Sequence, residues 1–181
     1  PHLFSSAASD VYKRQDSGRG WRHVVPSPKP KHVCDISLVQ ILARRGTVVI
    51  AGGGGGIPVV RDPNGVRKGV TAVIDKDLTS ALMGNVLGIN TLMILTAVPK
   101  VAIHFGTEKE ECLDRVTLQE IRAYHTEGHF PAGSMGPKID AAIRFLEGGG
   151  KRVIIGQIDQ AMQALNGCLL YTSDAADEKR W

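Results

Sequence analysis

Aromatic residues and cysteines are both scarce in this 181-residue chain. Only 5% of the residues are aromatic while 43% are hydrophobic, so aliphatic side chains must fill any core. The three cysteines, Cys34, Cys112 and Cys168, are widely separated and form no C-x-x-C pair. A disulfide scaffold and a cysteine-based zinc site are therefore not expected, and this cysteine usage fits a reducing cytoplasm.

Long apolar runs and a strong charge of one sign are also lacking. No run approaches the ~18 apolar residues of a membrane span, and the N-terminus has no basic-then-apolar signal layout. We therefore expect no membrane partner. The formal net charge of +4 is mild and does not by itself indicate a nucleic-acid partner. Part of the excess lies in residues 13–32, which leaves a basic nucleic-acid-interaction module as the non-enzyme alternative.

The two ends of the chain differ from the middle. Residues 1–15 (PHLFSSAASDVYKRQ) and 168–181 (CLLYTSDAADEKRW) show no clear core periodicity. Both resemble translated sequencing-adapter sequence, and we exclude them from the interpretation of the fold. The native part is then expected to be residues 16–167, a partial domain of a longer protein whose N-terminal half is missing.

Helical and strand patterns alternate along the middle of the chain. Helices are predicted at 36–45 (capped by Asp35), 78–87, 117–125 (opened by a capping box), 137–147 and 158–166. Strands are predicted at 47–51, 57–60, 69–74, 91–97, 101–105 and 152–155, with a turn at 62–65 between the second and third. This alternation is typical of an α/β sandwich with a mostly parallel sheet.

Five consecutive glycines follow the predicted strand at 47–51. The loop Gly52–Gly56 matches neither common phosphate-binding fingerprint, because Ile57 stands where G-x-G-x-x-G needs glycine and no Gly-Lys-Ser/Thr follows. It is either a loop that adopts unusual backbone angles, or a row of N–H groups that approaches a small anionic ligand.

Lysines stand at the start of two predicted helices. Lys138 follows Gly136-Pro137, where a cation opposes the helix dipole unless an anion such as phosphate lies between them. It is otherwise an exposed lysine. In Asp75-Lys76-Asp77, Asp77 either caps a helix or orients lysines that neutralise a phosphoryl group during transfer.

Neither a metal centre nor a serine nucleophile is indicated. The six histidines have no ligand spacing such as H-E-x-x-H. His125 and His129 are four residues apart, but Gly128 interrupts the helix that would align them. No G-x-S-x-G motif is present either.

Several long motifs occur together in a recognisable order: WRHVVPSPKP, VVIAGGGGGIPVV, AVIDKDLTSAL, LMILTAV and GHFPAGSMGPKIDAAIRFLE. In this order they closely resemble the carbamate kinases, a family with the amino-acid-kinase fold. The resemblance covers essentially all of residues 16–167. It implies an open three-layer αβα sandwich and a cytoplasmic homodimer. The implied reaction is reversible phosphoryl transfer between ATP and carbamate, giving ADP and carbamoyl phosphate, with Mg²⁺, in arginine degradation.

The resemblance also implies roles for individual residues. Lys76 and Lys138 would contact the transferred and nucleotide phosphates, and Asp77 would organise them. The expected nucleotide-binding residues are Asp75, Thr96, Ala97, Val98, Ser134, Met135 and Gly136. The expected small-substrate loop is Gly53, Gly54, Gly55 and Gly56. No residue is expected to be a metal ligand.

The chain departs from the family pattern in its missing motifs. The family's G-G-N-A-L and H-G-N-G-P-Q loops do not occur, and neither does its protruding subdomain. We therefore expect this polypeptide to bind nucleotide weakly and not to turn over. The alternative within the same fold is another phosphotransferase, such as a uridylate or aspartate kinase.

Overall fold

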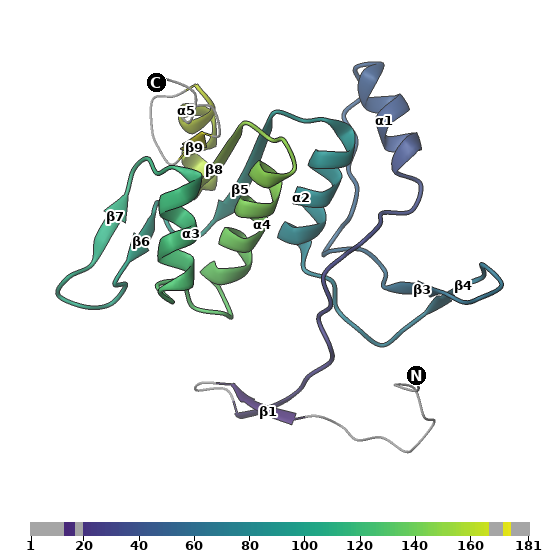
Figure 1. Ribbon diagram of the computed structural model, residues 1–181, viewed down its shortest axis with the longest axis horizontal. Helices are drawn as coiled ribbons and strands as arrows, with labels where there is room; N and C mark the ends of the chain where they lie inside the picture. Colours follow the sequence, from purple (N-terminus) through teal and green to yellow (C-terminus); the bar gives the residue numbers. More distant parts are fainter. Residues whose placement is uncertain (1–12, 17–19, 167–171, 175–181) are drawn as a thin grey trace. The chain divides into compact units, whose positions relative to one another are not determined.

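The computed structural model describes residues 13–16, 20–166 and 172–174 (Figure 1). Most of the two adapter-like ends, including Cys168, lies outside the described residues. The chain forms two compact units, one made of residues 1–28 and 57–73 and the other of residues 29–56 and 74–181.

The first unit contains two antiparallel hairpins. Strands β1 (Lys13–Asp16) and β2 (Gly20–His23) form one, and β3 (Val59–Arg61) and β4 (Arg67–Gly69) form the other. The Asp62 side chain accepts hydrogen bonds from the backbone of Asn64 and Val66, which closes the predicted turn. The strand predicted at 69–74 is wrong in its bounds. The strand that pairs with Val59–Arg61 is formed by residues 67–69, with Gly69 opposite Val59.

The second unit is built around two parallel strands. Its elements, in chain order, are α1 (Ile36–Arg44), α2 (Lys76–Leu87), β5 (Thr91–Thr96), β6 (Val101–Ile103), β7 (Glu111–Leu113), α3 (Leu118–Thr126), α4 (Met135–Glu147), β8 (Arg152–Gln157), the 3₁₀ turn η1 (Ile158–Gln160), α5 (Ala161–Leu165) and β9 (Thr172–Asp174). Strand β8 pairs with β5 in parallel and with β9 antiparallel. Strands β6 and β7 form a separate hairpin. The α/β class predicted from the sequence is confirmed.

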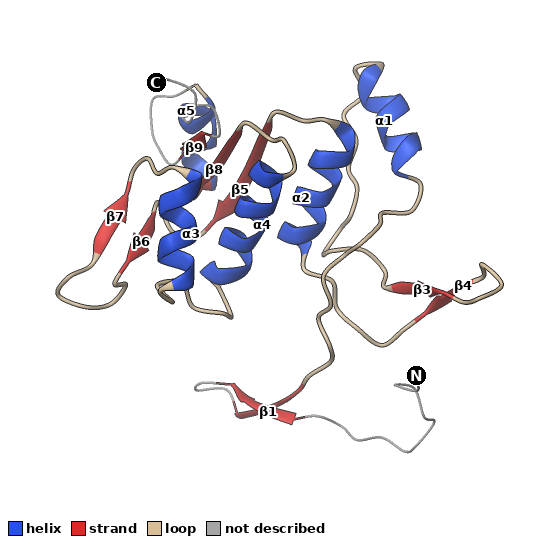
Figure 2. Cartoon of the chain, in the orientation of Figure 1, coloured by secondary structure: helices blue, strands red, loops and turns tan. Residues whose placement is uncertain are grey.

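Helices α2 and α4 pack together and against the parallel strands (Figure 2). The predicted apolar face of α4, Ile139, Ala142, Ile143 and Leu146, is buried, as are Val153, Ile154 and Ile155 of β8. Phe145 is fully buried, and a Cβ on Gly84 of α2 would come within 2.7 Å of its ring. Glycine at this position therefore lets the two helices approach closely.

Two helix starts differ from the prediction. Asp35 stands before α1, but its backbone is left-handed (φ 58°) and its side chain makes no capping bond. Asp75, not Asp77, caps α2, because its carboxylate accepts from the N–H groups of Asp77 and Leu78 at 2.9 and 3.0 Å. The capping box of α3 is confirmed, with Thr117 and Glu120 bonded to each other's backbone.

The strand predicted at 47–51 is not formed. This segment has no regular secondary structure, and Val48 and Ile50 are 91% and 97% exposed. A strand needs a neighbour for its backbone hydrogen bonds. The described part of the chain pairs no strand with residues 47–51. The last predicted helix, 158–166, begins instead with the single turn η1 and continues as α5.

Candidate active site

A cavity of about 450 Å³ lies where α2, α4 and β5 meet the β6–β7 hairpin. The first turns of both helices and the end of β5 contribute to its lining. The lining residues are Asp75, Lys76, Asp77, Thr96, Val98, Lys100, Ala102, Phe105, Pro131, Gly133, Ser134, Met135, Pro137 and Lys138. The cavity therefore brings together the two predicted helix starts that carry lysines, Asp75-Lys76-Asp77 and the segment around Lys138.

Asp77 is the centre of the charged end of this cavity. Its Oδ2 accepts a hydrogen bond from Lys138 Nζ at 2.8 Å, and its Oδ1 accepts one from Lys76 Nζ at 2.6 Å. Asp77 is buried, and the Lys138 side chain is only 18% exposed, whereas that of Lys76 is 53% exposed. Lys138 lies 61 positions from Asp77 in the sequence, whereas Lys76 is its direct neighbour. The three groups carry a net charge of +1, which suits an anionic ligand.

The protonation of Asp77 is set by these neighbours. Burial opposes ionisation of the carboxyl, but the hydrogen bonds from Lys138 and Lys76 outweigh it and lower the pKa of Asp77. The carboxylate is therefore ionised over the physiological pH range and holds both ammonium groups in place. Of the two interpretations of Lys138, an exposed lysine is wrong: the side chain is mostly buried and paired.

The walls of the cavity contain some of the predicted nucleotide-binding residues but not all. Thr96, Val98, Ser134 and Met135 line it, as does Asp75, whose Oδ1 also caps α2. Ala97 and Gly136 are absent from the lining. The carbonyl of Ala97 accepts from Gln157, and the buried Gly136 donates its N–H to Pro131 O at 2.9 Å.

The glycine loop is fastened to the start of α2. The Thr79 hydroxyl donates to Gly55 O at 2.8 Å, and a Cβ on Gly55 would lie 1.8 Å from Ile74 O. Gly55 also has φ 137°, so glycine is required there. None of Gly53, Gly54, Gly55 and Gly56 lines the cavity, but the loop lies beside the segment that leads to Lys76.

Six lining residues were not among the predicted site residues: Lys100, Ala102, Phe105, Pro131, Gly133 and Pro137. Phe105 is 65% exposed, which is unusual for an aromatic residue in a chain with so few. The scarcity of aromatic residues, together with the place of Phe105 at the end of the strand predicted at 101–105, was the available signal. Lys100 forms an ion pair with Asp114 of the hairpin and adds a third ammonium group to the cavity wall.

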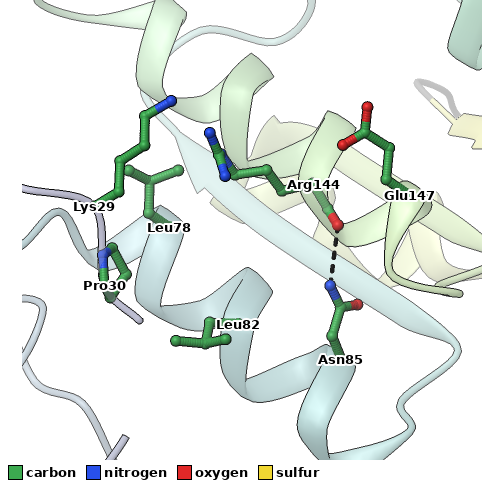
Figure 3. Close-up of a pocket in the computed structure, with 7 residues that line it drawn as sticks. All are labelled: Lys29, Pro30, Leu78, Leu82, Asn85, Arg144 and Glu147. Carbon is green, nitrogen blue, oxygen red and sulfur yellow. Dashed lines mark hydrogen bonds between the residues drawn. The ribbon is translucent and has the colours of Figure 1, made fainter. Parts of the chain in front are cut away.

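A second cavity, of about 220 Å³, lies over α2 and α4 (Figure 3). Asn85 Nδ2 donates to Arg144 O at 3.0 Å across it. Lys29 and Arg144 share the carboxylate of Asp140, at 3.3 and 3.0 Å. These cations are half exposed and already paired, so this cavity borders a surface ion-pair cluster that is more exposed than the Asp77 site.

Metal-binding groups do not gather at the cavity. Among the described residues no three His, Cys, Asp or Glu side chains lie close enough together to hold a metal ion. Both oxygens of Asp77 are bonded to lysines, and Asp75 Oδ1 is occupied by the helix cap. This arrangement fits an Mg²⁺ ion that is held mainly by nucleotide phosphates and water.

Within the described residues, no helix has the length and hydropathy needed to cross a membrane.

The profile of the Amino acid kinase family matches residues 5–157, and the chain belongs to this family. It is similar to the carbamate kinase of Pyrococcus furiosus, with 51% identity over 154 residues that cover 85% of this chain and 49% of the relative. It is also similar to the carbamate kinase of Staphylococcus haemolyticus, with 46% identity over 84% of this chain and 50% of the relative.

Solved structures show the same relationship. Carbamate kinase from Giardia lamblia bound to AMP-PNP superimposes with a TM-score of 0.84 and 44% identity, covering 90% of this chain and 51% of that one. N-acetylglutamate synthase from Neisseria gonorrhoeae, at 17% identity and a TM-score of 0.55, shares the fold alone. The predicted family and fold are confirmed. The chain spans about half the length of the curated relatives it matches.

Proposed function

We propose that this chain is the nucleotide-binding part of a carbamate kinase, which transfers a phosphoryl group reversibly between ATP and carbamate. The observation that carries the proposal is the Lys76–Asp77–Lys138 cluster at the start of two helices. The similarity to carbamate kinases, one of them bound to AMP-PNP, supports it. A cytoplasmic homodimer that works in arginine degradation belongs to the same proposal.

The cluster suits phosphoryl transfer because that reaction depends on positioning and charge neutralisation. An oxygen of carbamate forms a bond to the γ-phosphorus, and the bond from that phosphorus to the β–γ bridging oxygen breaks, leaving ADP with the electron pair. Lys76 and Lys138 donate hydrogen bonds to the phosphate oxygens while Asp77 keeps their ammonium groups in position. Mg²⁺, when bound, neutralises further charge on those oxygens.

The rest of the cavity is assigned to the nucleotide. Thr96, Val98 and Met135, together with Asp75 and Ser134, face the ligand, while Ala97 and Gly136 support this wall from behind. Gly53, Gly54, Gly55 and Gly56 face the small substrate. We propose that the polypeptide as it stands binds nucleotide weakly and does not turn over.

The direct test is binding of AMP-PNP with Mg²⁺, measured by calorimetry, for the chain and two lysine variants. Lys138→Met removes a mostly buried ammonium group, and we expect affinity to fall about 10- to 100-fold, as for loss of a charge-assisted hydrogen bond. Lys29→Met is the matched control, because it removes a lysine that also pairs with an aspartate but lies outside the active-site cavity. We expect it to bind like the parent chain.

Several results would contradict parts of this proposal. Absence of AMP-PNP binding, or equal binding by the two lysine variants, would remove the nucleotide assignment. ATP formation from ADP and carbamoyl phosphate at the rate of an intact carbamate kinase would contradict the proposed inactivity. Phosphorylation of UMP or aspartate, instead of carbamate, would favour the alternative kinases, and strongly salt-dependent retention of DNA or RNA would favour the nucleic-acid module.

A further inference from the structure

Phe105 is presented to the active-site cavity on a tightly bonded turn. The turn begins at His104, directly after β6, and His104 O accepts from the backbone N–H and the hydroxyl of Thr107 at 3.1 and 2.7 Å. Gly106 N donates to Glu110 Oε2 at 2.8 Å, which closes the turn from the other side. These bonds fix the backbone that carries Phe105.

The backbone of His104 is left-handed, with φ 52°. Histidine adopts this conformation more readily than most other non-glycine residues, and it fits a position inside a tight turn. The side-chain contact available to His104 is with His129: the two ring centroids are 4.4 Å apart and the rings are nearly perpendicular, at 80°.

His129 comes from the segment that also supplies Pro131 and Met135 to the lining of the cavity. It lies in the loop between α3 and α4, where its ring contacts Glu127 Oε2 at 3.1 Å and the edge of Tyr124. The side chain is only 14% exposed. Two residues later Pro131 lines the cavity, and its carbonyl accepts the N–H groups of Ser134 and Gly136 at the start of α4.

The His104–His129 contact thus joins two segments that are 25 positions apart in the chain and that both supply lining residues to one cavity. Phe105 adjoins one histidine, and Pro131 and Met135 follow the other. The charged cluster at Asp77 is held by hydrogen bonds that involve neither histidine. Loss of the ring contact would therefore loosen the apolar end of the cavity and leave the Lys76–Asp77–Lys138 hydrogen bonds in place.

We propose that His104 and His129 form a clamp that sets the spacing between Phe105 and the Pro131–Met135 wall, and that this spacing fits the flat base of a nucleotide. The two histidines are positioning residues that act through Phe105. The ligand assigned to this end of the cavity is an aromatic heterocycle stacked on the Phe105 ring. The inference rests on the proposed nucleotide function, which the experiment below tests separately.

The test compares a ligand that has a base with one that has only phosphates. Affinities for AMP-PNP and for inorganic tripolyphosphate, both with Mg²⁺, are measured for the parent chain and a matched set of variants. His129→Ala and His104→Asn both lose the ring contact, and asparagine tolerates the left-handed backbone of position 104. His129→Phe keeps a ring. His32→Ala removes an exposed histidine of the same unit as the control.

We expect His129→Ala and His104→Asn to bind AMP-PNP about two- to tenfold more weakly, the range for loss of one aromatic pair. Tripolyphosphate affinity should be unchanged in both variants. His129→Phe and His32→Ala should match the parent chain with both ligands. Equal weakening with both ligands, or no weakening with AMP-PNP, would overturn the clamp, because the ring contact would then not act at the base.

A second measurement needs no ligand. Amide hydrogen exchange should accelerate together in residues 104–110 and 131–136 of His104→Asn, because the variant releases one wall from the other. Acceleration confined to residues 104–110 would overturn the clamp. If the parent chain binds no AMP-PNP, the proposed nucleotide function fails. The exchange measurement still tests the clamp in that case: faster exchange in both segments of His104→Asn supports it, and unchanged exchange in residues 131–136 contradicts it.

Discussion

Replacing Asp77 by asparagine keeps the size of the side chain and removes its charge. The carboxylate is buried and accepts hydrogen bonds from Lys138 at 2.8 Å and Lys76 at 2.6 Å. In Asp77→Asn the mostly buried Lys138 loses its counter-charge, whereas the half-exposed Lys76 can turn to water. The two bonds therefore contribute unequally to the free energy of unfolding.

The magnitude follows from this difference in exposure. A hydrogen bond to a charged, buried partner contributes about 1.5–3 kcal/mol, and a largely exposed ion pair contributes about 0–1 kcal/mol. We therefore expect Asp77→Asn to lower the free energy of unfolding by about 2–3 kcal/mol. The matched control is Asp140→Asn, which removes a carboxylate shared by Lys29 and Arg144 at the second cavity. Those cations are 60% and 42% exposed, so its loss should cost about 0–1 kcal/mol.

Urea unfolding followed by circular dichroism, at several pH values, measures both variants. Because the pKa of Asp77 is lowered on folding from 3.8, ionisation of Asp77 stabilises the folded chain. That stabilisation is complete above pH 3.8 and is lost as the pH falls through the lower folded value. The difference between the parent chain and Asp77→Asn should therefore shrink in acid. Equal destabilisation by Asp77→Asn and Asp140→Asn near neutral pH would refute the reasoning.

Two further predictions concern stability. Gly84→Ala should lower the free energy of unfolding by about 1 kcal/mol, because overpacking against Phe145 costs about 2 kcal/mol and the higher helix propensity of alanine contributes about 1 kcal/mol in return. A urea midpoint equal to or above that of the parent chain would show that Phe145 can move aside. Thr117→Ala should lower the free energy of unfolding by about 1 kcal/mol through loss of the α3 cap, whereas Thr117→Ser should lower it much less. Equal urea midpoints for the two Thr117 variants would mean that the hydroxyl cap does not stabilise the chain.

Local patterns predicted those parts of the fold that depend on neighbours in the sequence. The capping box at Thr117, the buried face of α4 and the parallel strands β5 and β8 were all expected and all form. The strand predicted at 47–51 failed because a distant segment decides: these residues have the composition of a buried strand, but the described residues give them no partner. The cap of α2 is local, and Asp75 takes it instead of Asp77 because the helix begins at Lys76, two residues earlier than predicted.

The residues of the candidate site also fall into two groups, those that the sequence could indicate and those that only folding brings to the cavity. Asp75–Asp77 and Lys138 stand out in the sequence, because charged residues at helix starts have a physical meaning there. Lys100, Phe105 and Pro131 do not stand out, since they reach the cavity only through the folding of the hairpin and the α3–α4 loop. No spacing rule places His104 beside His129, yet their rings are 4.4 Å apart.

The sequence by itself determined the α/β alternation, the family resemblance and the two lysines that stand at helix starts. Periodicity and capping act over a few residues, so they can be read from the order of the amino acids. Only the tertiary structure decided that one aspartate holds both lysines, with Lys138 brought to Asp77 from 61 positions away. The packing of α4 on α2 creates that contact, and burial of the pair gives it its strength.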